Sequence, residues 1–294
     1  MSKIIINGSD NAKAADKASI CNQSIAERLN AGPKGTKVTL INHNTGETLG
    51  VYENKLTICG SQFNAMKAFG LQVAGVDFPT YNKEMKLDNS VSIDPKNERI
   101  VQLFCVSDSG CGSTPKDVKA SSYTDRIAPA PENPSNKSEF NSNMIMPFRF
   151  VDKDKDLNDD LRKYYFGRKT FDILGKVGYY FKTFDTEPHL YVRYADGTPI
   201  TPEMYNIHSE QTAECFVQTR LRITTNDFRD YFDNILGWDK ARISSLSLCY
   251  AWYDDTIDKY VYYQDITPYS ILYFSYQWLV DSNVAIDVLY DIYY

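Results

Sequence analysis

Residues 245–252 read Ser-Leu-Ser-Leu-Cys-Tyr-Ala-Trp, with a bulky side chain at every second position. Successive side chains of a β-strand point to opposite faces of the sheet, so the bulky residues share one face and the small residues share the other. A strand that is apolar on both faces is expected to be covered on both sides. The stretch therefore predicts a buried central strand in a mainly β protein.

The same two-residue period recurs along much of the chain. Residues 38–41 and 49–52 flank Asn44-Thr45-Gly46, where the glycine can adopt the positive φ that a tight turn needs, so a β-hairpin is predicted. Further strands are predicted at 56–59, 71–78, 91–93, 100–106, 144–151, 190–194, 215–223, 260–266, 269–278 and 284–294.

Three helical segments interrupt the strands. Residues 10–30 have apolar positions at helical spacing and predict a short amphipathic helix or docking arm. Ser61 is a suitable cap for a helix over 61–69 that Gly70 would end. Thr225 is a suitable cap for a helix over 225–236, whose apolar positions follow a helical period and which Gly237 would stop.

Residues 107–142 show no periodicity and are rich in Ser, Asn, Gly and Pro. Most connections between elements are about 4–6 residues long, so such a segment is either functional or a linker. We predict an N-terminal arm at 1–36, a first β domain at 37–142 and a second at 143–294. The second is rich in aromatic residues, and the expected fold class is mainly β, with two sandwich-like or jelly-roll-like domains and short flanking helices.

The charge of the chain disfavours nucleic acid as a specific partner. Residues 1–150 hold 17 basic and 15 acidic side chains, a balance of +2, whereas residues 151–294 hold 15 and 23, a balance of −8. Phosphate binding requires a basic face. The six cysteines form no CxxC motif, which argues against a zinc site. The first residues lack the apolar core of a signal peptide, so synthesis in the cytoplasm is expected.

The acidic run Asp152-Lys153-Asp154-Lys155-Asp156 has the alternate spacing of a calcium-binding loop. The rest of the calcium-loop pattern is missing, because Leu157 stands where the turn needs glycine and Lys163 stands where a bidentate Glu is needed. A solvated charged turn is the favoured interpretation, with a bound ion as the alternative.

No other group of residues forms a catalytic set. The histidines at 43, 189 and 208 are isolated in the sequence, and Gly110-Cys111-Gly112-Ser113 lacks the lysine of a phosphate loop and the spacing of a nucleophile elbow. The acids Asp254, Asp255, Glu210 and Glu214 could pair as in a glycosidase, but sequence spacing does not establish their separation in space. We therefore predict no enzyme activity, no cofactor, and no catalytic or metal-binding residues.

Two aromatic clusters remain, Tyr260-Tyr262-Tyr263 and Tyr273-Tyr276-Trp278. Such rings can stack on sugars, but tyrosine is also enriched where proteins meet. A core or subunit-interface role is favoured for both clusters.

In plan, the strand series 38–106 and 144–294, with the helices at 61–69 and 225–236, resembles the double jelly-roll major capsid proteins of icosahedral, membrane-containing phages. The resemblance implies two eight-stranded jelly rolls side by side, trimers that self-assemble into a shell, and contact with other virion proteins. It also implies that residues 1–30 face neighbouring subunits or an internal membrane. The alternatives are a neck, ring or tail protein of a phage, and a carbohydrate-binding β-sandwich module.

Overall fold

The computed structural model describes residues 35–56, 81–87, 99–122, 124–199, 213–254, 262–280 and 284–293. The predicted helices at 10–30 and 61–69 and the predicted strands at 71–78 and 91–93 lie outside these residues. No helix in the described part of the chain is long and apolar enough to cross a membrane.

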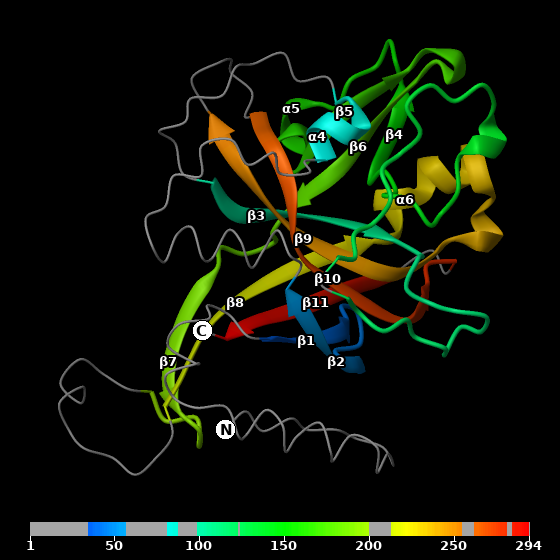
Figure 1. Ribbon diagram of the computed structural model, residues 1–294. Coiled ribbons are helices and arrows are strands. Elements are labelled where there is room, and N and C mark those ends of the chain that lie inside the picture. Colours follow the sequence, from blue (N-terminus) through cyan, green and yellow to red (C-terminus); the bar gives the residue numbers. More distant parts are fainter. Residues whose placement is uncertain are drawn as a thin grey trace.

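The described residues form a mainly β fold (Figure 1), as the sequence predicts. The strands are β1 (Gly35–Asn42), β2 (Thr48–Leu56), β3 (Arg99–Ser107), β4 (Arg149–Asp152), β5 (Tyr165–Phe171), β6 (Lys176–Thr183), β7 (His189–Tyr194), β8 (Ala213–Thr224), β9 (Arg242–Asp254), β10 (Tyr262–Trp278) and β11 (Ala285–Tyr293). The short helices are α4 (Tyr81–Met85), η1 (Lys137–Glu139), α5 (Asp159–Arg162), η2 (Asp172–Leu174), α6 (Thr225–Tyr231), η4 (Phe232–Leu236) and η5 (Trp238–Lys240).

The strands form two antiparallel sheets. Sheet A has the order β7-β8-β11-β1-β2. Sheet B has the order β2-β10-β9-β3-β6, and β6 also pairs with β4 on one side and with β5 on the opposite side. Strand β2 belongs to both sheets, because it pairs with β1 along most of its length and with β10 at Lys55 and Leu56. The sheets are thus joined at one edge.

The pairings cross the domain boundary predicted near residue 142. Strand β1 pairs with β11, β2 pairs with β10, and β3 pairs with β9, so strands from both predicted domains lie side by side in each sheet. The described sheets are therefore not divided at residue 142. Local periodicity identifies strands but does not identify their partners, and this is why the sequence suggested two sequential domains.

The predicted central strand is β9, and both of its faces are buried as expected. Its bulky face, with Leu246 and Leu248, lies on the side of sheet A, where Ser270 of β10 and Tyr290 of β11 join the sheets through a 2.8 Å hydrogen bond between their hydroxyl groups. The small face includes Ser247 and is also fully buried. Because small side chains leave room above the sheet, another layer can pack closely there.

The irregular segment 107–142 is not a linker, because it is held against β9. Its two ends meet where the amide of Asp108 donates to the carbonyl of Ser142 at 2.8 Å. The amide of Gly110 donates to the Ser244 hydroxyl at 2.8 Å, and a Cβ at Gly110 would lie 1.8 Å from the Ser244 carbonyl oxygen. The segment thus packs against the start of β9 so closely that only glycine fits at position 110.

The residue that caps helix α6 lies one position earlier than predicted. Thr224 caps it, and Thr224 and Asp227 form a capping box in which each side chain accepts from the other residue's backbone amide. The helix continues into η4 and ends at Gly237, which has φ of 93°. The predicted turn after β1 is also present, with Gly46 at φ of 71°.

Candidate functional site

The most highly connected polar group on sheet A is the carboxylate of Asp287 on β11. Arg222 donates from Nε to Oδ1 at 2.9 Å and from Nη2 to Oδ2 at 3.4 Å. His43 Nδ1 lies 3.1 Å from Oδ2, and Arg220 Nη1 lies 4.0 Å from it. The Asp287 side chain is only 8% exposed, so these ionic contacts are largely shielded from water.

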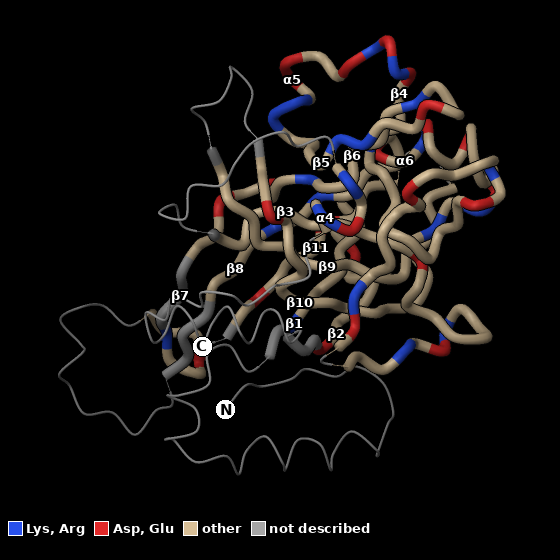
Figure 2. Tube along the Cα trace, turned by 45° about the horizontal axis from the view of Figure 1, so that its top comes forward, with Lys and Arg blue, Asp and Glu red and all other residues tan. Residues whose placement is uncertain are grey.

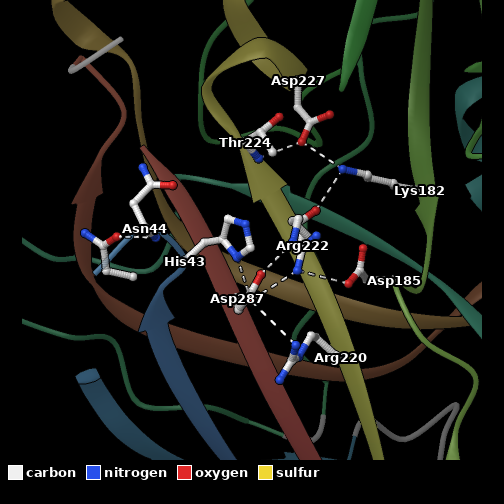
Figure 3. A network of polar contacts seen from close by, with 10 residues as sticks. His43, Asn44, Lys182, Asp185, Arg220, Arg222, Thr224, Asp227 and Asp287 are labelled. Carbon is white, nitrogen blue, oxygen red and sulfur yellow. Dashed lines mark hydrogen bonds and ion pairs between the residues drawn. The ribbon is translucent and has the colours of Figure 1, made fainter. Parts of the chain in front are cut away.

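Strand register brings these residues together. Asp287 is paired with Arg222 on β8 and with Ile41 on β1, and His43 follows directly after β1. Arg220 is two residues from Arg222 and therefore lies on the same face of β8. Figure 3 shows the side chains of His43, Arg220 and Arg222 converging on Asp287.

These contacts shift the ionisation of both partners. Burial alone would raise the pKa of the Asp287 carboxyl, but the hydrogen bonds from Arg222 and then His43 outweigh burial, so the pKa is lowered. The hydrogen bond to Asp287 raises the pKa of Arg222. Both groups are therefore held in their charged forms at neutral pH.

A second buried carboxylate, Asp227 of α6, lies close to the first. Its Oδ2 accepts from Lys182 Nζ at 2.9 Å and from the Thr224 amide at 2.7 Å, and its Oδ1 accepts from the Tyr165 hydroxyl at 2.5 Å. The Asp227 side chain is fully buried and the Lys182 side chain is 12% exposed. Burial, reinforced by the charge of Asp227, raises the pKa of Tyr165, which keeps the phenol protonated as a donor.

The two carboxylates belong to one network. Lys182 Nζ donates to the Arg222 carbonyl at 2.8 Å, and Arg222 Nη2 also lies 3.3 Å from Asp185 Oδ2. We call this set the inter-sheet polar network; it consists of His43, Lys182, Asp185, Arg222, Asp227 and Asp287 (Figure 3). It joins β6 of sheet B to β8 and β11 of sheet A and to the start of α6.

The network contains a histidine in contact with an aspartate, and such a pair supplies two of the three members that a catalytic triad needs. A triad also needs a nucleophile bonded to the histidine. Among the described residues, the ring of His43 has no hydroxyl or thiol partner. Each of the carboxylates of Asp227 and Asp287 instead accepts hydrogen bonds from a basic side chain. This geometry suits a structural clamp between the sheets.

The lowered pKa of Asp287 predicts an effect on acid stability. A carboxyl whose pKa is lower in the folded protein stabilises the fold above its unfolded pKa, near 3.9, and this contribution is lost as the pH falls through the folded value. Asp287→Asn should therefore lower the free energy of unfolding at pH 7 by about 1–2 kcal/mol. Its difference from the wild type should shrink as the pH falls from about 5 towards 2.

Urea unfolding at a series of pH values measures this difference. Asp154→Asn, in an exposed turn, controls for the loss of one carboxylate. A stability difference that stays constant from pH 7 to pH 2 would contradict the role of the Asp287 charge.

A second candidate site is a surface patch at one end of β10. Arg242 lies over the rings of Tyr276 and Trp278, with its guanidinium carbon 4.1 and 5.3 Å from their centroids. Arg229 lies over the ring of Trp238 at 3.8 Å, and the Trp238 indole donates to the carbonyl of Val280 at 3.0 Å. We call this set the Trp278 patch; it consists of Arg229, Trp238, Arg242, Tyr276, Trp278 and Val280.

The acidic run at 152–156 is a charged turn, the favoured interpretation, and two of its acids have basic partners. Asp152 Oδ1 accepts from Lys176 Nζ at 2.6 Å, and Asp156 is paired with Arg162 and accepts from the Tyr179 hydroxyl. Asp154 is exposed. Figure 2 shows acidic and basic residues intermixed along the connection from β4 to α5. Among the described residues, no three potential ligands gather as a metal site would require.

The other candidates lie on separate elements where the structure describes them. In the 110–113 turn, Asp117 Oδ2 accepts from the amide of Ser113, which closes the turn on itself. His189 and Glu214 lie in the hairpin of β7 and β8, and Asp254 ends β9. His208, Glu210, Asp255 and Tyr260 lie outside the described residues.

The aromatic clusters are mainly packed. Tyr263 is buried in edge contact with Phe166, with ring centroids 4.5 Å apart. Tyr273 is buried beneath Lys119, whose Nζ lies 5.0 Å from the ring centroid. Trp278, in contrast, is 44% exposed. The packing role is confirmed for Tyr263 and Tyr273, and Trp278 lies on the surface.

The sequence did not reveal the inter-sheet polar network. Arg220 and Arg222 are two residues apart, so they share one face of their strand. Asp287 interrupts the apolar residues of β11. That signal marks residues on an outward face. It does not show that β8 lies next to β11.

One family model matches the chain over residues 47–225, which is 179 of its 294 residues. The model is described as a family of unknown function, DUF7208. The match runs from just before β2 to the first residue of α6. No curated protein and no solved structure matches the chain.

Proposed function

The chain belongs to the DUF7208 family, and we propose that it is a virion structural protein, the major capsid protein of an icosahedral phage shell that self-assembles from trimers. The inter-sheet polar network carries this proposal, because Lys182 of sheet B donates to the Arg222 carbonyl of sheet A and to the buried carboxylate of Asp227, which joins the two sheets. On this proposal the protein is made in the host cytoplasm, resides in the capsid and has no catalytic role.

The packing of the chain supports a structural role. Both faces of β9 are covered, and the long 107–142 segment lies against the sheet. A capsid subunit must keep its shape under the forces of assembly, and cross-linking by buried ion pairs and tight packing resists local opening. The exposed Trp278 then remains as an apolar group on the surface of this rigid body.

A neck, ring or tail protein would use the same rigid β architecture. Electron microscopy of the assembled species separates these roles, because a neck or tail protein forms closed rings or tubes whereas a capsid protein forms shells.

A carbohydrate-binding module is the second candidate, and the exposed Trp278 favours it. However, Arg242 and Lys119 lie over the rings of Tyr276 and Tyr273. A sugar would have to compete with these cations for the ring faces. The patch therefore supports a glycan platform less well than a protein contact.

Light scattering of the purified full chain over a concentration series tests the proposal. The smallest stable species should have three times the chain mass of 33.6 kDa, about 101 kDa, or should form larger shells. A strict 33.6 kDa monomer at every concentration would contradict a capsid role.

A further inference from the structure

The Trp278 patch has the composition of a protein interface. It contains two tryptophans, a tyrosine and two arginines, which are the residue types that contribute most to binding between proteins. Trp278 is 44% exposed and Val280 is 38% exposed, so both have surface left to bury.

The patch is also held in place before any partner binds. Arg242 Nε donates to the buried carboxylate of Asp108 at 3.0 Å, which fixes the guanidinium beside Tyr276 and Trp278. Trp238 is fixed by its hydrogen bond to Val280 and by Arg229. Side chains that are already ordered lose little conformational entropy on binding.

Positive and negative charges around the patch are balanced, whereas residues 151–294 as a whole carry a net negative charge. The exposed acids on the adjoining segment from α6 to η5 are Asp230, Asp233 and Asp239. They are offset by Lys240, by Arg229 of the patch, and by Lys137, whose Nζ donates to the Asn234 carbonyl at 2.7 Å. Among these six side chains the balance is three to three, and Arg242 of the patch is paired with Asp108, whereas residues 151–294 together carry −8.

A contact between identical surfaces requires a patch that does not repel itself. In a two-fold interface the same residues face one another, so a strongly acidic surface would be opposed by its own charge. The balanced rim around Trp278 and Val280 meets this condition.

We propose that the Trp278 patch binds the same patch of a second copy of this chain across a two-fold axis, joining copies from neighbouring trimers. This inference rests on the proposed function, and it adds the surface through which the trimers associate.

The double variant Trp278→Ser/Val280→Ser tests the interface in the full chain. Sedimentation and light scattering should show trimers intact while association between trimers weakens at least about tenfold. The matched control is Val51→Ser, because Val51 on β2 is 40% exposed and lies outside the patch. Circular dichroism and the Tm establish that each variant is folded.

Val280→Cys provides a second measurement that leaves the stacked rings unchanged. Under air with a copper phenanthroline catalyst, two thiols at the axis lose two protons and two electrons to oxygen and form a disulfide between copies. A covalent dimer should form in Val280→Cys in excess of that formed by Val51→Cys and by the wild type, whose native cysteines set the background.

The outcomes separate this inference from the proposed function. If the wild type assembles and the double variant assembles equally well, or if Val280→Cys cross-links no more than Val51→Cys, the interface is elsewhere and the capsid role stands. If the wild type is monomeric at every concentration, both proposals fail. If a glycan array binds the wild type and not the double variant, the patch is a carbohydrate platform and the interface is overturned.

Discussion

Asp227→Ala is expected to lower the free energy of unfolding by about 3–5 kcal/mol, the range for breaking a buried ion pair from one side. The substitution leaves the ammonium of Lys182 without its carboxylate in a site that is only 12% exposed. It also removes the acceptor of the Tyr165 hydroxyl and half of the capping box of α6. These effects act at the same point, where α6 meets both sheets. Urea unfolding at pH 7 measures the loss.

The matched control is Asp233→Ala, an exposed acid six residues further along the same helical segment, which should change stability by less than about 0.5 kcal/mol. Combining Lys182→Met with Asp227→Ala should recover part of the loss, because Lys182→Met removes the ammonium that Asp227→Ala leaves unpaired. A loss below about 1 kcal/mol in Asp227→Ala would show that water or nearby groups compensate the lysine, and the network would then not be the clamp we infer.

The strands that could be predicted from the sequence are those in which two kinds of side chain alternate, so that each face carries one kind. β9 and β11 are of this kind, and so is the first hairpin, whose turn glycine has the expected positive φ. Two predicted strands at 260–266 and 269–278 are one long strand, β10, interrupted by register shifts around Asp265 and Pro268. A proline and a bulge look like a chain break in sequence although the strand continues.

Strands β5 and β6 were missed because their patterns do not alternate. In β6, five consecutive residues from Val177 to Phe181 are buried, so both faces are apolar. In β5, Gly167 has φ of 67° and Lys169 is buried with its ammonium 5.5 Å from the ring centroid of Phe171. Only the tertiary packing explains a buried lysine in a strand, and no local rule predicts it.

The inter-sheet polar network depends on long-range register in the same way. The sequence places Arg222 and Asp287 on their own strands, but their contact requires β8 and β11 to be neighbours with these two residues opposite each other. A shift of one residue would turn Asp287 towards the apolar interior. The charge network and the register therefore support one another, and this coupling is visible only in the folded chain.

Gly110→Ala is expected to lower the free energy of unfolding by about 1–3 kcal/mol, the usual cost of forcing an extra carbon into a packed site. The new methyl group would lie 1.8 Å from the Ser244 carbonyl oxygen, and a backbone atom of the central strand β9 cannot move aside as a side chain can. The 107–142 segment must therefore lift at this point. The Tm and urea unfolding measure the cost, and the reaction rate of the Cys111 thiol with an aromatic disulfide reports the lifting.

Gly112→Ala is the matched control, because a Cβ there would meet the Asp117 carboxylate, which is exposed and can rotate away. It should be less destabilising than Gly110→Ala and should leave Cys111 labelling closer to the wild-type rate. Cys111 is partly buried and donates to the Pro115 carbonyl at 3.2 Å, so lifting the segment should expose it. Equal effects of the two variants would mean that the segment is only loosely attached to β9. In that case its closeness to Ser244 would not be what holds this layer on the sheet.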